Sequence, residues 1–112
     1  MRQRALTLVV ILIAGCASVG GLDQGKPTFQ ASTKKLDSHY VACVVARWSK
    51  ISPTTHAEET AGGFRVTVSN GSTQTEELLI VVSRADGADV VLHERVELLA
   101  LHAYREAAKA CL

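Results

Sequence analysis

Two cysteines, Cys43 and Cys111, constrain the fold of this chain more than any other feature. Each lies on the apolar stripe of a segment with helical periodicity, one early in the folded region and one near its end. If both helices cover the same face of a sheet, the two thiols can approach closely enough for a disulfide. Such a bridge persists only in an oxidising compartment, so this prediction requires that the chain is exported.

The N-terminal residues have the layout of an export signal. Two arginines within the first four residues precede an uncharged apolar run of ten residues, Ala5–Ala14, and polar sequence follows Cys16. A basic start and a short apolar run that ends in small residues are typical of a signal peptide. A spanning helix needs about 20 apolar residues, so this run is too short to remain as a transmembrane anchor. Residues 1–15 are therefore predicted to be a signal peptide that is removed.

The residues Ile13-Ala14-Gly15-Cys16 resemble the lipobox of bacterial prolipoproteins. The resemblance covers only the N-terminus up to Ala17. It implies that the Cys16 thiol receives a diacylglycerol, that cleavage makes Cys16 the first residue of the mature chain, and that its amine is often acylated as well. Each buried methylene contributes ~0.8 kcal/mol, so two or three acyl chains hold a protein on a bilayer almost permanently.

The residue after the lipobox cysteine indicates a location. In lipoproteins of double-membraned bacteria an Asp at this position commonly marks retention in the inner membrane, whereas this chain has Ala17. The resemblance therefore implies that the protein is lipid-anchored at the periplasmic face of the outer membrane. The alternative is an ordinary secretory signal peptide in which Cys16 is incidental.

The mature chain is short. Removal of residues 1–15 from the 112-residue chain leaves 97 residues, enough for one small domain. Residues 16–32 are predicted to be the lipidated cysteine and a flexible tether, because this stretch is rich in Gly and Ser and lacks periodicity. Residues 33–112 then form a single small α+β domain. A disulfide between Cys43 and Cys111 would close a long loop and contribute roughly 4 kcal/mol to its stability.

Hydrophobic periodicity predicts two helices that flank three strands. Apolar spacings of three and four indicate the helices, and alternation or short apolar runs indicate the strands. The helical segments are 33–49 and 96–111, the strands are 64–69, 76–84 and 90–95, and a polar loop covers 51–63. Turns at Asn70-Gly71 and Asp86-Gly87 would make the strands antiparallel. The predicted fold class is α+β, a two-layer sandwich of a three-stranded antiparallel meander and two helices in the order α-β-β-β-α.

The second predicted strand carries a continuous apolar run, Leu78–Val82. Successive side chains of a strand point to opposite faces, so packing on the helices accounts for only half of this run. A contiguous apolar patch on the other face usually marks a contact surface. The predicted interaction or dimer face comprises Leu79, Val81, Val91 and His93. The alternative is a central strand whose uncovered side is shielded by the long stems of neighbouring arginines.

Residues capable of acid–base or metal chemistry are present without a recognisable motif. Glu94 and Glu97 are candidates for paired carboxylates, but no nucleophile stands beside a base and no GxSxG sequence occurs. A metal site would draw on His39, His93 and His102, because oxidation of the two cysteines removes their thiolate ligands. The chain is therefore predicted not to be an enzyme and to use no cofactor and no metal.

The predicted role is that of a non-enzymatic envelope accessory or protein-interaction module. Its partners would be the membrane, through the lipid on Cys16, and an envelope protein. Nucleic acid is not an expected partner, because 12 basic and 11 acidic residues are spread along the chain without a concentrated basic face. The alternative function is a periplasmic lipoprotein that binds a small ligand or a metal through His39, His93 and His102.

Overall fold

The computed structural model describes residues 21–69, 74–95 and 102–112. The predicted signal peptide, Cys16, the Asn70-Gly71 turn and Glu97 lie outside the described residues. The elements in chain order are η1 (Leu22–Gln24), β1 (Phe29–Thr33), α1 (Asp37–Trp48), β2 (Thr55–Thr60), β3 (Gly63–Ser69), β4 (Thr75–Arg84), β5 (Gly87–Glu94) and α2 (Ala103–Ala110). None of the described helices has the length and apolarity that crossing a membrane requires.

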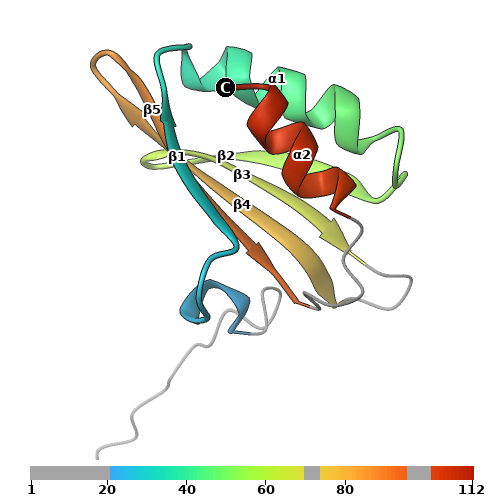
Figure 1. Cartoon of the computed structure of the whole chain (residues 1–112). Helices are drawn as coiled ribbons and strands as arrows, with labels where there is room; N and C mark the ends of the chain where they lie inside the picture. Colours follow the sequence, from blue (N-terminus) through green and yellow to red (C-terminus); the bar gives the residue numbers. More distant parts are fainter. Residues whose placement is uncertain (1–20, 70–73, 96–101) are drawn as a thin grey trace, which may run out of the picture.

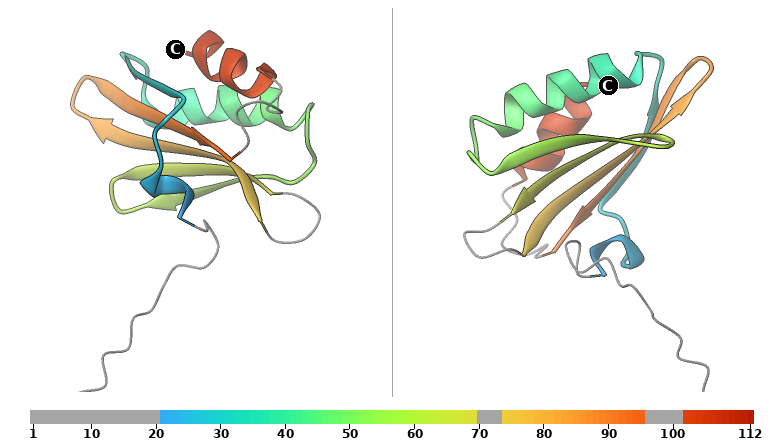
Figure 2. Two further views of the ribbon diagram at one scale, coloured as in Figure 1. Left: turned by 60° about the horizontal axis from the view of Figure 1, so that its bottom comes forward. Right: turned by 180° about the vertical axis from the view of Figure 1, so that it is seen from behind.

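The described strands form one antiparallel sheet with the order β1-β5-β4-β3-β2. Both α-helices cover one face of this sheet (Figure 1). The short helix η1 contacts β4 and β5 and lies on the side of the sheet away from α1 and α2, as the two views in Figure 2 show. The molecule is therefore a two-layer α+β fold with η1 beneath the lower end of the sheet.

The prediction of a three-stranded meander is wrong, because two further strands extend the sheet at its edges. β1 lies at the end of the segment expected to be a flexible tether, and it pairs with β5 through Phe29 opposite Leu92. β2 lies inside the segment expected to be a polar loop, and it pairs with β3. Edge strands bury little side-chain area, so both sequences are short, polar and weakly patterned.

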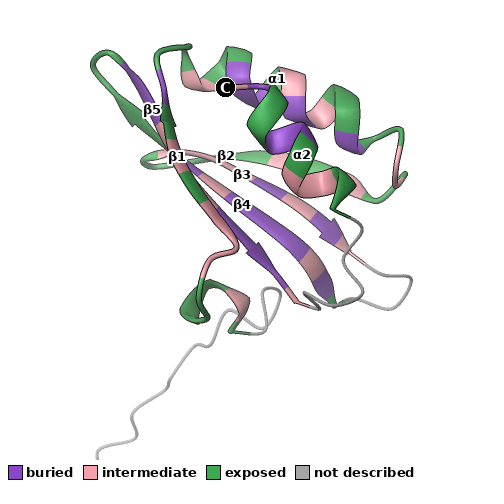
Figure 3. Cartoon of the chain, in the orientation of Figure 1, coloured by how far each residue is buried: buried purple, intermediate pink, exposed green. Residues whose placement is uncertain are grey.

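The core lies between the helices and the three central strands (Figure 3). Tyr40 and Trp48 of α1 are fully buried, and the Trp48 ring meets the Tyr104 ring of α2 edge to face, with centroids 5.3 Å apart. The Tyr40 hydroxyl donates to the Ala108 carbonyl at 2.9 Å, and Trp48 Nε1 donates to the Tyr104 carbonyl at 3.1 Å. The buried aromatic residues of α1 therefore satisfy their polar atoms on the backbone of α2.

The predicted disulfide is confirmed. Cys43 on α1 and Cys111 directly after α2 are bonded at a sequence separation of 68, with their Cα atoms 5.8 Å apart. Two hydrogen bonds fix the chain beside the bridge: Lys35 Nζ donates to the Cys111 carbonyl at 2.7 Å, and Thr33 Oγ1 donates to the Leu112 carbonyl at 2.8 Å. The C-terminal helix is thus tied both to α1 and to the end of β1.

Replacement of the bridge tests how much of the stability it supplies. Cys43→Ser should lower the free energy of unfolding by roughly 2–5 kcal/mol, because the unfolded chain regains the freedom that the closed loop removes. Urea unfolding of the two proteins under non-reducing conditions measures this difference. Ala42→Ser, on the exposed neighbour of Cys43, controls for a serine in the helix and should have little effect. Equal midpoints for Cys43→Ser and Ala42→Ser would contradict the expectation.

Candidate functional site

The structure divides the predicted interaction face between the two sides of the sheet. Leu79 and Val81 belong to the core beneath the helices, because Leu79 lies opposite Leu92 in the antiparallel ladder. Val91 and His93 therefore point to the other face, since adjacent residues of a strand alternate sides. The expectation that these four residues share one surface is not met, and Leu79 and Val81 are not available to a partner.

The uncovered face carries a smaller apolar patch than the sequence suggested. Val82 is 44% exposed, and its neighbours Ile80 and Val91 are half-buried. At the other end of this face, Leu78 and His93 lie opposite each other and are buried, His93 to 5% exposure, where η1 contacts β4 and β5. We call Ile80, Val82 and Val91 the open-face patch.

The histidines of the alternative ligand site lie in three separate places. His39 is exposed in the first turn of α1, His102 is exposed at the start of α2, and His93 is buried on the opposite side of the sheet. Cys43 is held in the disulfide and has no thiolate to offer. In the part of the chain that the structure describes, no group of three or more His, Cys, Asp or Glu side chains could hold a metal ion.

A buried pair of glutamates forms the most unusual polar site of the described residues. Glu77 of β4 and Glu94 of β5 lie opposite each other in the ladder and are only 3% and 8% exposed. Both face the helix layer, because each is two residues away from a core leucine of its own strand, Leu79 or Leu92. The sequence suggested Glu94 and Glu97 as a candidate pair of carboxylates, but Glu97 lies outside the described residues and Glu77 was missed.

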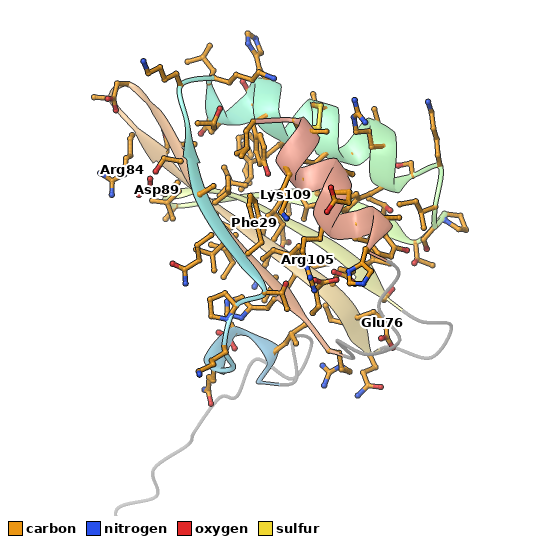
Figure 4. The ribbon with its side chains drawn as sticks, in the orientation of Figure 1. Phe29, Glu76, Arg84, Asp89, Arg105 and Lys109 are labelled. Atoms are coloured by element: carbon orange, nitrogen blue, oxygen red, sulfur yellow. A yellow bond between two sulfur atoms is a disulfide. The ribbon has the colours of Figure 1, made fainter. Side chains whose placement is uncertain are left out.

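Glu94 is the acceptor on which side chains from two distant segments converge. Arg105 of α2 donates from Nε to Glu94 Oε1 at 3.0 Å, and its Nη2 lies 2.9 Å from the same oxygen. The Thr28 hydroxyl, just before β1, also donates to Glu94 Oε1 at 2.7 Å. Figure 4 places Arg105 beneath α2, over the end of the sheet. The carboxylate thus links β5 to α2 and to the start of β1.

The pKa of Glu77 is raised to about 9, chiefly by burial. The charge of Glu94, a hydrogen bond to Glu94 and the charge of Glu76 contribute to this rise, whereas the Arg105 guanidinium opposes it. Oε2 of Glu77 and Oε2 of Glu94 are both buried without a donor. A proton on Glu77 supplies the missing donor, because a protonated carboxyl can donate to the carboxylate opposite. At neutral pH Glu77 therefore keeps its proton, and the Arg105 guanidinium lies beside the Glu94 carboxyl.

The surroundings of the pair favour a structural role over acid–base catalysis. General acid–base chemistry requires that a substrate come within hydrogen-bond reach of the carboxyl. Three surface hollows among the described residues lie at the β1–β5 side of the sheet, at the β2–β3 turn and between the two helices. None of these three is lined by Glu77 or Glu94. The pair fixes α2 and the start of β1 on the sheet.

A second polar cluster closes the other end of the sheet, where β4 turns into β5. Asp89 accepts a hydrogen bond from Ser32 Oγ at 2.7 Å and forms an ion pair with Arg84, whose side chain is labelled beside Asp89 in Figure 4. The hydrogen bond from Ser32 and then the Arg84 guanidinium lower the pKa of the Asp89 carboxyl. These contacts join the hairpin to β1.

Comparisons with known proteins assign no family to this arrangement. No family model matches the sequence significantly, and neither does any curated protein or solved structure. The function is therefore inferred from the sequence and from the geometry of the described residues.

The buried proton predicts how stability depends on pH. The pKa of Glu77 is raised from 4.5 to about 9 in the folded chain, so the folded state binds more protons than the unfolded state between these values. The free energy of unfolding should consequently fall as pH rises from about 5 to about 9. Glu77→Gln keeps a donor for Glu94 and cannot ionise, so we expect it to raise the free energy of unfolding at pH 8 by about 1–3 kcal/mol.

Urea unfolding at several pH values between 5 and 9 measures this difference. The control is Glu59→Gln on β2, which changes an exposed glutamate in the same way. Glu77→Gln should flatten the fall of stability with pH, whereas Glu59→Gln should leave it as in the parent chain. Parallel curves for all three proteins would show that Glu77 does not hold the proton.

Proposed function

We propose that this chain is an exported bacterial lipoprotein, anchored through Cys16 at the periplasmic face of the outer membrane. Its domain would serve as a non-enzymatic envelope accessory that binds another envelope protein. The lipobox resemblance of Ile13-Ala14-Gly15-Cys16 supports the anchor. Ala17, at the position where Asp would mark retention in the inner membrane, supports a location in the outer membrane. The lipid would hold the domain on the bilayer and leave its surface for contact with a partner.

The disulfide carries this proposal. Cys43 and Cys111 lie far from the leader in sequence, so their bond is independent of the lipobox resemblance. Structural disulfides form and persist in exported proteins and are rare in the reducing cytosol. Two separate parts of the chain therefore favour the same oxidising compartment.

A binding role is favoured by the surfaces of the described domain. The helices cover one face of the sheet, and on the other face the open-face patch of Ile80, Val82 and Val91 remains partly accessible. The paired carboxyls of Glu77 and Glu94, by contrast, are buried. An accessible apolar patch and a buried acid pair fit contact with another protein better than turnover of a substrate.

The anchor is tested by the intact mass of the protein extracted from membranes of a double-membraned bacterium. The mass should correspond to a chain that starts at Cys16 and carries acyl groups, because the lipobox cysteine is the site of modification. Cys43 and Cys111 should react with an alkylating agent only after reduction. Cys16→Ser should lose the acyl mass, whereas the nearby control Ser18→Ala should keep it. A parent chain without acyl mass, or an acylated Cys16→Ser protein, would overturn the proposal.

The binding role is tested by a charge placed on the open-face patch. Val82 and Ser83 are adjacent exposed residues on opposite faces of β4, so Val82→Glu and Ser83→Glu add the same charge to different surfaces. Chemical cross-linking in intact envelopes should trap a complex with the parent chain and with Ser83→Glu. The same complex should be lost with Val82→Glu, because a charge is costly to bury in an apolar contact. Equal yields for both variants, or no complex with the parent chain, would contradict this role.

A further inference from the structure

We propose that the mature protein presents the η1 end of its sheet to the lipid bilayer, so that its two α-helices face away from the membrane. The surface that meets the lipid headgroups would be formed by η1 and the residues that follow it up to Lys26. This inference deepens the proposed function and rests on it, because it requires that Cys16 carry the lipid.

The chain between the lipid and the domain is short. η1 begins at Leu22, six residues after Cys16. An extended chain spans at most about 3.6 Å per residue, so this connection reaches no more than about 22 Å. Residues 16–32 were expected to form a loose tether. In the structure, Leu22–Gln24 form η1, and β1 begins at Phe29 within the same segment. The domain therefore has far less freedom to rotate above the membrane.

η1 belongs to the folded domain and does not lengthen the tether. It contacts both β4 and β5, and Gln24 N donates to the Gly21 carbonyl at 3.0 Å. The chain that follows is held by Thr28, whose N–H donates to the Leu92 carbonyl at 2.8 Å and whose hydroxyl donates to Glu94 at 2.7 Å. η1 and the chain that follows it therefore move together with the domain.

The course of the chain also separates η1 from the helix layer. Both views in Figure 2 place η1 on the side of the sheet away from α1 and α2. β1 carries the chain away from η1 along the edge of the sheet and delivers it to α1 at the opposite end. Five residues of strand at about 3.3 Å each add to the separation between η1 and the start of α1. To place the helix layer against the bilayer, the connection before Leu22 would have to span at least the roughly 17 Å of β1, close to its maximum reach of about 22 Å. Such extension costs conformational entropy, whereas placing η1 against the bilayer does not require it.

Three exposed lysines report on this orientation. Lys26 follows η1, Lys34 follows β1 directly, and Lys50 follows α1. With η1 against the membrane, Lys26 lies among the headgroups, where its long stem can extend along the lipid surface. Lys34 and Lys50 belong to the far end of β1 and to the helix layer, so they remain in water. The three side chains therefore provide an internal comparison within one molecule.

The experiment measures the reaction of each lysine with a membrane-impermeant amine-reactive ester. The full-length mature lipoprotein, with its acyl mass verified, is inserted into preformed phosphatidylcholine vesicles, and the labelled peptides are quantified by mass spectrometry. The matched control carries a Gly/Ser insert of about 20 residues between Ala17 and Ser18, which restores a loose tether. We expect Lys26 to react several-fold more slowly in the native chain than in the insert variant, and Lys34 and Lys50 to react equally in both.

Each outcome decides the matter. Equal reaction of Lys26 in the two proteins would overturn the proposed orientation while the acyl mass leaves the lipid anchor intact. Selective protection of Lys34 or Lys50 would place the helix layer on the membrane and would also overturn it. A mature chain without acyl mass would overturn the proposed function and this inference together, and the mass measurement reveals that case before any labelling.

Discussion

The pairing of β4 with β5 decides what the rest of this domain can be. With Leu79 opposite Leu92, the leucines face the helices and form the centre of the core, and Glu77 is brought opposite Glu94 on the same side. A shift by one residue would exchange the two faces and expose the core. The same register leaves Val82 on the uncovered side, so core, acid pair and open-face patch all depend on one set of backbone hydrogen bonds.

A disulfide to α1 and an ion pair to β5 hold α2 in place. The disulfide joins Cys43 of α1 to Cys111 after α2, and at the other end of α2 Arg105 binds the Glu94 carboxylate. α2 has only eight residues, a length at which an isolated helix is marginal in water. The disulfide and the ion pair therefore fix both ends of a helix that its own backbone hydrogen bonds would not keep folded.

Much of this arrangement follows from the sequence, and the failures have physical causes. α1, the central strands β3, β4 and β5, and the disulfide were predictable, because buried elements carry strong apolar periodicity. β1 and β2 were missed because edge strands pack one face only and are built here from small and polar residues. The interaction face was assigned wrongly because alternation within a strand does not give the phase between strands. The length of the turn gives this phase. Two residues separate Arg84 from its partner Gly87, so odd-numbered residues of β4 share a face with even-numbered residues of β5.

The disulfide also divides the domain into parts that respond differently to tension. The bond encloses the chain from Cys43 to Cys111, a ring that contains β2, β3, β4, β5 and α2, whereas η1 and β1 lie outside it. If the N-terminus is fastened to a membrane, a pull between membrane and partner enters through η1 and reaches β1 before any other strand. β1 can separate from β5 under such a load, whereas the covalent bond keeps Cys43 and Cys111 from being pulled apart. The mechanically weak part of the protein would then be its N-terminal edge, and the surface within the ring would remain folded while that edge yields.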